Sequence, residues 1–462
     1  MGGLVTDQSL NLAALQYGEG TEYSVGPISN NSSTLEFLDK YNHIWRISHQ
    51  EILTHQANYA SPNYEMPWAI ATWPGNGNAA NGEAQLLAPF VDLNSDGIYS
   101  PAQGDYPDIR GDEALYFMMN DYNHLHEVSE GGRIGVNIHA MTYAYTDVAG
   151  SPLNDCVFVS LKIRNERTQI LSDFYIGIFN EFDLGNAFDD YVASDSLRNM
   201  MYVYNGYDFD ESQPFLNGYG NYLPAQGCMF LNYPMTKGLC FYNGVGGPNE
   251  FPIQSMHYYN YMRGIWKDNT FVTEGGNGYG GTTPANFMFS GDPVTNSGWT
   301  EANAGMGPHD RRIIMSTGPF TFLPGEQLCI DVAFPFARSA QQNNALDAIV
   351  ELREAADFIQ NFYDSQNHDC AMQVVGVEEH TTLGNVAVYP NPSNGRFTVS
   401  SYDEIKYVEV YDGLGKRVLT KNATRNNSRA IEVDLSKEPK GVYLYQVYDE
   451  DGKLQSGKVI LQ

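Results

Sequence analysis

The segment 91–98, VDLNSDGI, places oxygen-bearing side chains at alternate positions. Asp92, Asn94 and Asp96 alternate, Gly97 permits a sharp turn, and the main-chain carbonyl of Ile98 follows. Ca²⁺ takes about six to eight hard oxygen ligands, and protein loops supply them from such alternating positions. The spacing therefore predicts a calcium loop. The alternative is an Asx-turn loop, in which the same side chains bond their own backbone.

The residues after this segment separate it from an EF-hand. The last position of an EF-hand loop is a bidentate glutamate, but Gln103 stands there. Pro101 would also block the helix that leaves an EF-hand. A shorter calcium loop, of the kind found in extracellular modules, is closed by a later carboxylate. Asp105 is our candidate for that ligand, and Asp108 is the second choice.

A second acidic segment, 181–195, overlaps an apolar run that we expect to be a strand (173–184). Its five carboxylates have no Lys or Arg among them, and they are Glu181, Asp183, Asp189, Asp190 and Asp195. Adjacent carboxylates repel one another unless they are solvated or bind a metal ion. We therefore expect a second calcium site here, with a solvated acidic loop as the alternative. A third acidic group, 205–211, is expected at the surface.

His124 and His126 are the strongest candidates for a catalytic metal site. On a strand, residues i and i+2 face the same way and can share a metal, and Glu130 and His139 follow. The pattern resembles a cupin metal motif. It lacks the glycine before the first histidine and a histidine after the Pro-Gly at 324–325. Histidines in a polar loop are the alternative.

No sequence motif assigns a reaction. The chain has no G-x-S-x-G, P-loop, H-E-x-x-H or dinucleotide-binding motif. The aromatic segment 257–266 could stack on sugar rings, but a core strand anchored by Trp266 is the interpretation that we favour. We name no catalytic residue and favour a non-enzymatic role. A secreted hydrolase acting on polysaccharide or protein is the alternative.

The charge of the chain is unevenly distributed. The sequence holds 55 acidic and 26 basic residues, but residues 381–462 hold 10 acidic and 11 basic ones. The excess negative charge therefore lies before residue 381. It argues against nucleic acid and anionic membranes as partners, and it suits bound cations. No apolar run of about 18 residues exists, so no transmembrane segment is predicted.

Short apolar runs between Gly, Asn, Pro and Asp clusters predict strands at 133–148, at 155–166, at 173–184 and on either side of a turn within 311–338. One helix is predicted over 344–366, capped by Asn344. The fold class is therefore mainly all-β, with a large β-sandwich or jelly-roll-like domain closed by one helix. Cys228 and Cys240 could close a hairpin disulfide, with free buried cysteines as the alternative.

From residue 385 the sequence changes character. Seven short strand patterns separated by turns predict an antiparallel, immunoglobulin-like sandwich over 385–462. This segment resembles the type A C-terminal sorting domain of type IX secretion substrates from Bacteroidetes. The resemblance rests on Tyr389, Pro390, Asn391, Pro392, Gly395, Val408, Val410, Asp412, Gly415, Asp434, Leu435, Ser436, Gly441, Val442, Tyr443, Leu444, Gly457, Lys458, Val459 and Ile460.

The resemblance implies a partner, the type IX secretion machinery at the outer membrane. It also implies an extracellular or outer-surface location reached through the periplasm. In that family the domain is usually removed after export, and the cargo is released or attached to surface lipopolysaccharide. The preceding region resembles secreted proteins of unknown function from the same bacteria. The chain starts without a signal-peptide pattern, so we expect the sequence to lack its true N-terminus.

These observations predict three parts: an acidic β-rich cargo domain over 1–370, a linker over 371–384 and a sorting domain over 385–462. We expect structural Ca²⁺ to stabilise the cargo domain. Its role is expected to be binding, adhesion or extracellular assembly, with a glycan or further copies of the chain as candidate partners.

Overall fold

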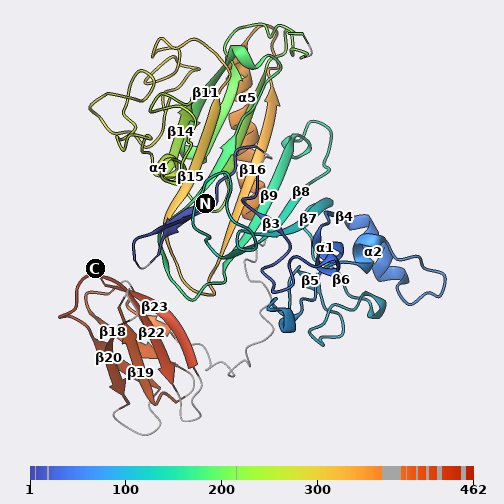
Figure 1. Cartoon of the computed structure of the whole chain (residues 1–462), viewed down its shortest axis with the longest axis vertical. Helices are drawn as coiled ribbons and strands as arrows, with labels where there is room; N and C mark the ends of the chain where they lie inside the picture. Colours follow the sequence, from blue (N-terminus) through green and yellow to red (C-terminus); the bar gives the residue numbers. More distant parts are fainter. Residues whose placement is uncertain are drawn as a thin grey trace. The chain divides into compact units, whose positions relative to one another are not determined.

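The computed structural model describes residues 1–5, 7–17, 20–214, 216–366, 387–391, 393–401, 404–412, 416–423, 429–448 and 454–461. The chain forms two compact units, Met1–Val375 and Gly376–Gln462 (Figure 1). The predicted linker, 371–384, lies outside the described residues, so the predicted boundaries stay predictions. Both units are mainly β-structure, as the sequence predicts.

Two antiparallel sheets form the body of the first unit. The five-stranded sheet has the order β14 (Lys237–Phe241), β15 (Arg312–Phe322), β10 (Leu171–Asn180), β1 (Gly2–Leu4) and β2 (Leu10–Leu12). The larger sheet has the order β11 (Asp190–Asp195), β12 (Met200–Asn205), β13 (Pro224–Phe230), β16 (Gln327–Arg338), β9 (Cys156–Asn165), β8 (Val136–Ala144), β7 (Glu113–Asn120) and β3 (Ser24–Val25), and β4 (Trp45–Ser48) also pairs with β7. A small ribbon joins β5 (Phe90–Val91) to β6 (Tyr106–Pro107).

The chain passes from one sheet to the other at several points, two of which lie between β9 and β10 and between β15 and β16. β9 pairs with β16 in the large sheet, and β10 pairs with β15 in the smaller one. The Pro324-Gly325 turn therefore carries the chain between sheets instead of closing a hairpin. The core between the two sheets is apolar and includes Phe174, Ile313 and Phe230. This arrangement fixes which strand ends meet at the edge of the smaller sheet.

Helix α5 (Ala345–Ser365) covers the other face of the large sheet (Figure 1). The Asn344 side chain accepts a hydrogen bond from the Asp347 N–H at 3.2 Å, so the predicted N-cap is confirmed. Leu346 and Val350 are 38% and 37% exposed and lie outside the buried face of the helix. The buried face consists of Ala345, Ala348, Ile349, Leu352, Ala355, Ala356, Ile359 and Tyr363.

Four more α-helices lie in the described part of the first unit, and the sequence did not predict them. They are α1 (Leu35–Tyr41), α2 (His49–Asn58), α3 (Trp68–Ala71) and α4 (Ser255–Met262). Single 3₁₀ turns are η1 (Ala79–Asn81), η2 (Pro101–Gln103), η3 (Pro152–Asp155), η4 (Ala187–Asp189) and η5 (Ser196–Arg198). The strand predicted at 257–266 is wrong, because α4 occupies most of that segment. Consecutive residues Tyr258–Met262 are all buried, which removes the helical periodicity.

The hairpin disulfide proposed between Cys228 and Cys240 is wrong. Both are free, buried cysteines. Cys228 lies on β13 and Cys240 on β14, which belong to different sheets. Cys329 takes part in a disulfide bond, and such bonds persist in oxidising compartments such as the cell exterior.

The second unit contains seven described strands in two antiparallel sheets, as the sequence predicts. One sheet has the order β17 (Ala387–Tyr389), β18 (Arg396–Ser400) and β21 (Ala430–Asp434). The other has the order β20 (Arg417–Asn422), β19 (Tyr407–Tyr411), β22 (Gly441–Tyr448) and β23 (Leu454–Leu461). Phe397, Val408 and Val447 belong to their shared apolar core. Among the helices of the described segments, none has the length and apolar character needed to cross a bilayer.

Candidate functional site

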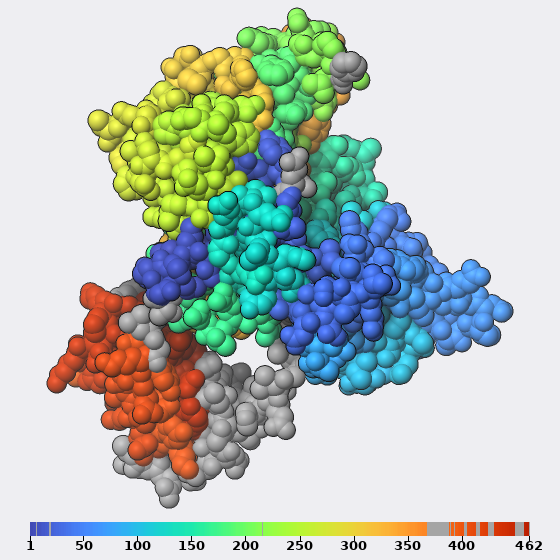
Figure 2. All heavy atoms as spheres, in the orientation of Figure 1, coloured from blue at the N-terminus to red at the C-terminus, as the bar shows by residue number. Residues whose placement is uncertain are grey.

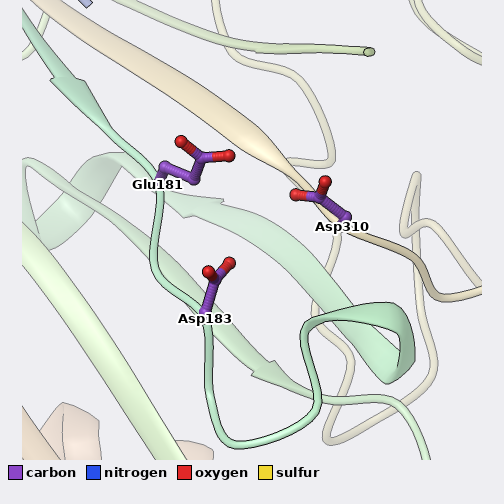
Figure 3. Close-up of side chains that lie close together, drawn as sticks. All are labelled: Glu181, Asp183 and Asp310. Atoms are coloured by element: carbon purple, nitrogen blue, oxygen red, sulfur yellow. The ribbon is translucent and has the colours of Figure 1, made fainter. Parts of the chain in front are cut away.

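Three carboxylates converge where β10 ends and β15 begins. Asn180, the last residue of β10, pairs with Ile313 of β15. The antiparallel register therefore brings the segment after β10 to the segment before β15. Glu181, Asp183 and Asp310 each offer a carboxylate oxygen, and these atoms lie within 4.8 Å of one another (Figure 3). Sequence reasoning found the first two and missed Asp310, since it could not know that these two strands pair.

Arg312 compensates part of this negative charge. Its Nη2 lies 2.5 Å from Glu181 Oε1, and its Nη1 lies 3.0 Å from Asp310 Oδ1. Its Nε donates to the Tyr17 hydroxyl at 3.0 Å. Partial desolvation raises the pKa of Asp183, and repulsion from Asp310 and Glu181 raises it further. One arginine thus faces three carboxylates, and a bound cation would relieve the remaining repulsion.

Asp190, the first residue of β11, lies deeper. Its side chain is buried, and Oδ2 accepts a hydrogen bond from the Leu184 N–H at 3.1 Å. Oδ1 has no hydrogen-bond partner among the described residues. Burial, then repulsion from Asp189, Asp210 and Asp183, raises the pKa of Asp190 to about 9. A buried carboxylate oxygen without a donor needs either a proton or a cation.

Asp189 and Asp210 complete this acidic group. Asn205 Nδ2 donates to Asp189 Oδ1 at 3.0 Å, and burial with repulsion from Asp210 raises the pKa of Asp189 to about 6. Asp210 accepts hydrogen bonds from the N–H groups of Asn186 and Tyr219. Burial raises its pKa as well. The prediction that the segment 205–211 is at the surface is wrong for Asn205 and Asp210, which are both buried.

Asp195 lies at the far end of β11 from Asp190 and is not part of this acidic group. Its Oδ2 is 2.8 Å from Arg198 Nη1 and 3.6 Å from Arg353 Nε. Its Oδ1 also accepts from the N–H groups of Leu197 and Arg198. The Asp195 side chain therefore caps η5 and pairs with Arg198, three residues later, and with the distant Arg353.

The predicted calcium loop lies between β5 and β6 and satisfies its own backbone. Asp92 accepts from the N–H groups of Ser95 and Gly97, both at 2.7 Å. Asn94 accepts from the Asp96 N–H, and Asp96 accepts from the Ile98 N–H. This is the hydrogen bonding of an Asx-turn loop, the alternative that the sequence left open. Calcium at this loop stays a prediction.

Asp105, the candidate closing ligand, holds both ends of the loop through its carboxylate. It is fully buried, and its two oxygens accept from the N–H groups of Leu93 and Ser100 at 3.0 and 2.7 Å. Both hydrogen bonds fix the loop ends, so the closure does not require a metal ion.

The histidines lie in a loop, as in the alternative that the sequence left open, and they do not form the candidate metal pair. His124 and His126 lie in the loop between β7 and β8 and not on a strand. His126 is buried, and its ring nitrogens lie 2.7 and 2.8 Å from the carbonyl oxygens of Leu12 and Asp121. His139, on β8, has its Nδ1 2.7 Å from the Tyr116 hydroxyl. These contacts are structural, and they leave no ring nitrogen of His126 for a metal.

Sorting-motif residues hold the start of the second unit to its last strand. Asn391 Nδ2 donates to the Lys458 carbonyl, and the Ile460 N–H donates to Asn391 Oδ1, both at 2.9 Å. Gly395 has φ +102°, and a Cβ there would lie 2.6 Å from Ser436 Cα, so only glycine fits. The Tyr443 hydroxyl donates to the Pro439 carbonyl. Of the other motif positions, Tyr389 lies on β17, Pro390 follows it, Gly441 begins β22, and Pro392 and Gly415 lie outside the described residues.

Residues 387–462 match the family described as the secretion system C-terminal sorting domain. The second unit is therefore a sorting domain, and the chain is a substrate of the type IX secretion system, exported to the cell surface or the medium. No curated protein matches the chain.

Solved structures offer distant likenesses. CopC from Methylosinus trichosporium OB3b has 15% identity and a TM-score of 0.13, over 16% of this chain and 89% of that chain. A polysaccharide lyase has 10% identity and a TM-score of 0.22, over 81% of this chain and 38% of that chain. The adhesin domain of Epf from Streptococcus pyogenes has 7% identity and a TM-score of 0.14, over 74% and 82%. These TM-scores are too low to carry an argument.

The raised pKa of Asp190 predicts a specific pH dependence of stability. The folded state holds this proton more tightly than the unfolded state, whose pKa is near 3.8, so the free energy of unfolding falls as pH rises from there to about 9. In EDTA, the free energy of unfolding of the wild type should fall between pH 6.5 and 8.5. In Asp190→Asn this fall should be smaller by about 1–3 kcal/mol. Guanidinium unfolding of the full chain at both pH values measures this change.

Glu274→Gln is the matched control, because it removes one carboxylate that is exposed. Groups far from Asp190 titrate equally in all three proteins, so the difference between variants reports Asp190 and the carboxylates that it repels. Identical pH slopes in wild type and Asp190→Asn would contradict the assignment.

Proposed function

We propose that this chain is an exported binding protein. Its first unit, Met1–Val375, is the cargo unit and uses structural Ca²⁺ to hold the acidic loops at the ends of β10 and β12 and before β15. The observation that carries the calcium proposal is Asp190, whose buried Oδ1 has no donor among the described residues. The nearby cluster of Glu181, Asp183 and Asp310 adds three carboxylate ligands of the type that Ca²⁺ prefers. Export supports the choice of ion, because extracellular modules bind Ca²⁺ at concentrations present outside the cell.

The proposed role is binding, adhesion or assembly rather than catalysis. Four carboxylates with raised pKa values, Asp183, Asp189, Asp190 and Asp210, lie at or near strand ends. His126 and His139 bond within the fold. The excess negative charge of the cargo unit favours neutral or cationic partners over nucleic acid. The proposed partner is a glycan, one of the two candidate partners that the sequence suggests.

Calcium should raise the thermal stability of the full chain. At about 10–100 times Kd, one site adds about 1.4–2.7 kcal/mol to the free energy of unfolding. The midpoint of a thermal melt should therefore rise when CaCl₂ replaces EDTA at pH 7.5. In Asp183→Asn and Asp190→Asn the rise should shrink, whereas Glu274→Gln should respond like wild type.

Asp92→Asn tests the other predicted loop in the same melt. A further loss of the calcium response in this variant would assign a second site there. A wild-type melt that is unmoved by calcium would contradict the calcium proposal altogether.

The second unit, Gly376–Gln462, is the sorting unit and should direct export by itself. A reporter carrying a signal peptide and residues 376–462 should reach the surface or medium of a host that has the type IX system. The same reporter without residues 376–462 should stay in the periplasm. Asn391→Ala should reduce export, because it removes the two hydrogen bonds to β23. Protease accessibility and fractionation measure the location, and a tailed reporter retained in the periplasm would overturn the export assignment.

A further inference from the structure

A surface hollow of about 560 Å³ lies next to the acidic group but has a different character. It is formed by the η4 turn, the loop after β12 and the residue before the α5 cap. In Figure 2 the segment after β12, coloured green, lies at the top of the view. The residues that matter for its chemistry are Phe188, Tyr207, Phe209, Asp208, Glu211 and Asn343.

Three aromatic rings of this hollow face solvent. Phe188 and Tyr207 are each 58% exposed, and Phe209 is 47% exposed. Large aromatic side chains dominate cores and interfaces, because each buries a large apolar area. Three exposed rings around one hollow therefore mark a surface that a ligand can cover. The Phe188 ring is held edge-on to the His309 ring, with centroids 5.5 Å apart.

The loop after β12, which carries Tyr207 and Phe209, is fixed by hydrogen bonds. Asn205 Oδ1 accepts from the Tyr207 N–H at 3.0 Å. Asp208 Oδ1 accepts from the Ala345 N–H at the start of α5 at 3.3 Å. Asp210 anchors the same loop through two further backbone N–H groups. A ligand would therefore meet a pre-organised surface and would not have to order it.

The polar groups of the hollow distinguish among ligands. No basic residue of the described segments lines it, so anionic ligands such as phosphates or uronates would meet negative charge there. Two of its three carboxylates are already engaged, Asp189 with Asn205 and Asp208 with Ala345. Glu211 and Asn343 have side chains without a hydrogen bond inside the described segments. The Glu211 carboxylate and the Asn343 amide suit a ligand with hydroxyl groups better than a polycation.

We propose that this hollow binds a neutral glycan, whose pyranose rings stack on Tyr207 and Phe209 while their hydroxyls bond Glu211 and Asn343. Stacking uses the apolar C–H face of a sugar ring against an aromatic face. The hydroxyl groups at the ring edge supply donors to the carboxylate and both donors and acceptors to the amide. This inference names the partner of the binding role proposed above and rests on that role.

Titration calorimetry of the purified full chain with neutral hexasaccharides of glucose, xylose and mannose tests the proposal. At least one should bind, and Tyr207→Ala and Phe209→Ala should each weaken it at least tenfold. Tyr207→Phe should retain the affinity, because it keeps the ring. Phe271→Ala is the matched control, since Phe271 is an exposed aromatic residue (60%) outside the hollow.

Spermine and a uronate oligomer serve as charged probes. Loss of glycan affinity in the two ring variants, with Phe271→Ala unchanged, supports the proposal. Absence of binding by every neutral hexasaccharide, equal weakening by Phe271→Ala, or preferential binding of spermine or uronate would overturn it. Purified protein is used in both calcium and EDTA, so a failure here is separate from a failure of export or of the calcium site.

Discussion

Negative charge collects at the edge where β10 meets β15 and β11 begins, and only part of it is compensated by arginine. Nearby carboxylates are neutralised where an arginine lies beside them. Buried Glu301 pairs with Arg311 at 2.8 Å and accepts from the Val192 N–H at 2.7 Å. Asp190 lies two residues before Val192 on β11, and its Oδ1 has no such partner within the part of the chain that the structure describes. Breaking a buried pair is costly because a charge is left alone, and Asp190 is in that position unless a proton or cation joins it.

This constraint links stability to the place where the protein works. The cargo unit carries almost all of the chain's excess negative charge, whereas the sorting unit is close to neutral. A buried carboxylate that must be protonated destabilises the fold as pH rises, but a bound cation removes that penalty. In the proposed function, cations at extracellular concentrations complete the fold after export. The hollow with exposed rings lies beside the same loops, so their order also fixes the proposed ligand surface.

Much of this organisation could be predicted from the sequence, but not the contacts that bring distant segments together. Strands β9, β10, β15 and β16, the Asn344 cap and the seven-stranded sorting unit follow from local periodicity and turn residues. Helix α2 also had a local signal, since Ser48 and Glu51 form a capping box that sequence reasoning overlooked. Helix α4 had no usable signal because it is buried on consecutive positions. Asp310 and Arg312 join the site only through the pairing of β10 with β15.

A crystal structure of the full chain grown with CaCl₂ at pH 7.5, with anomalous data collected at long wavelength, would locate any bound calcium ion. We expect a calcium peak bonded to Asp190 Oδ1 or to the oxygens of Glu181, Asp183 and Asp310, and no peak at Asp190 in Asp190→Asn. A map without calcium at either place, with Asp190 Oδ1 bonded to ordered water, would contradict it.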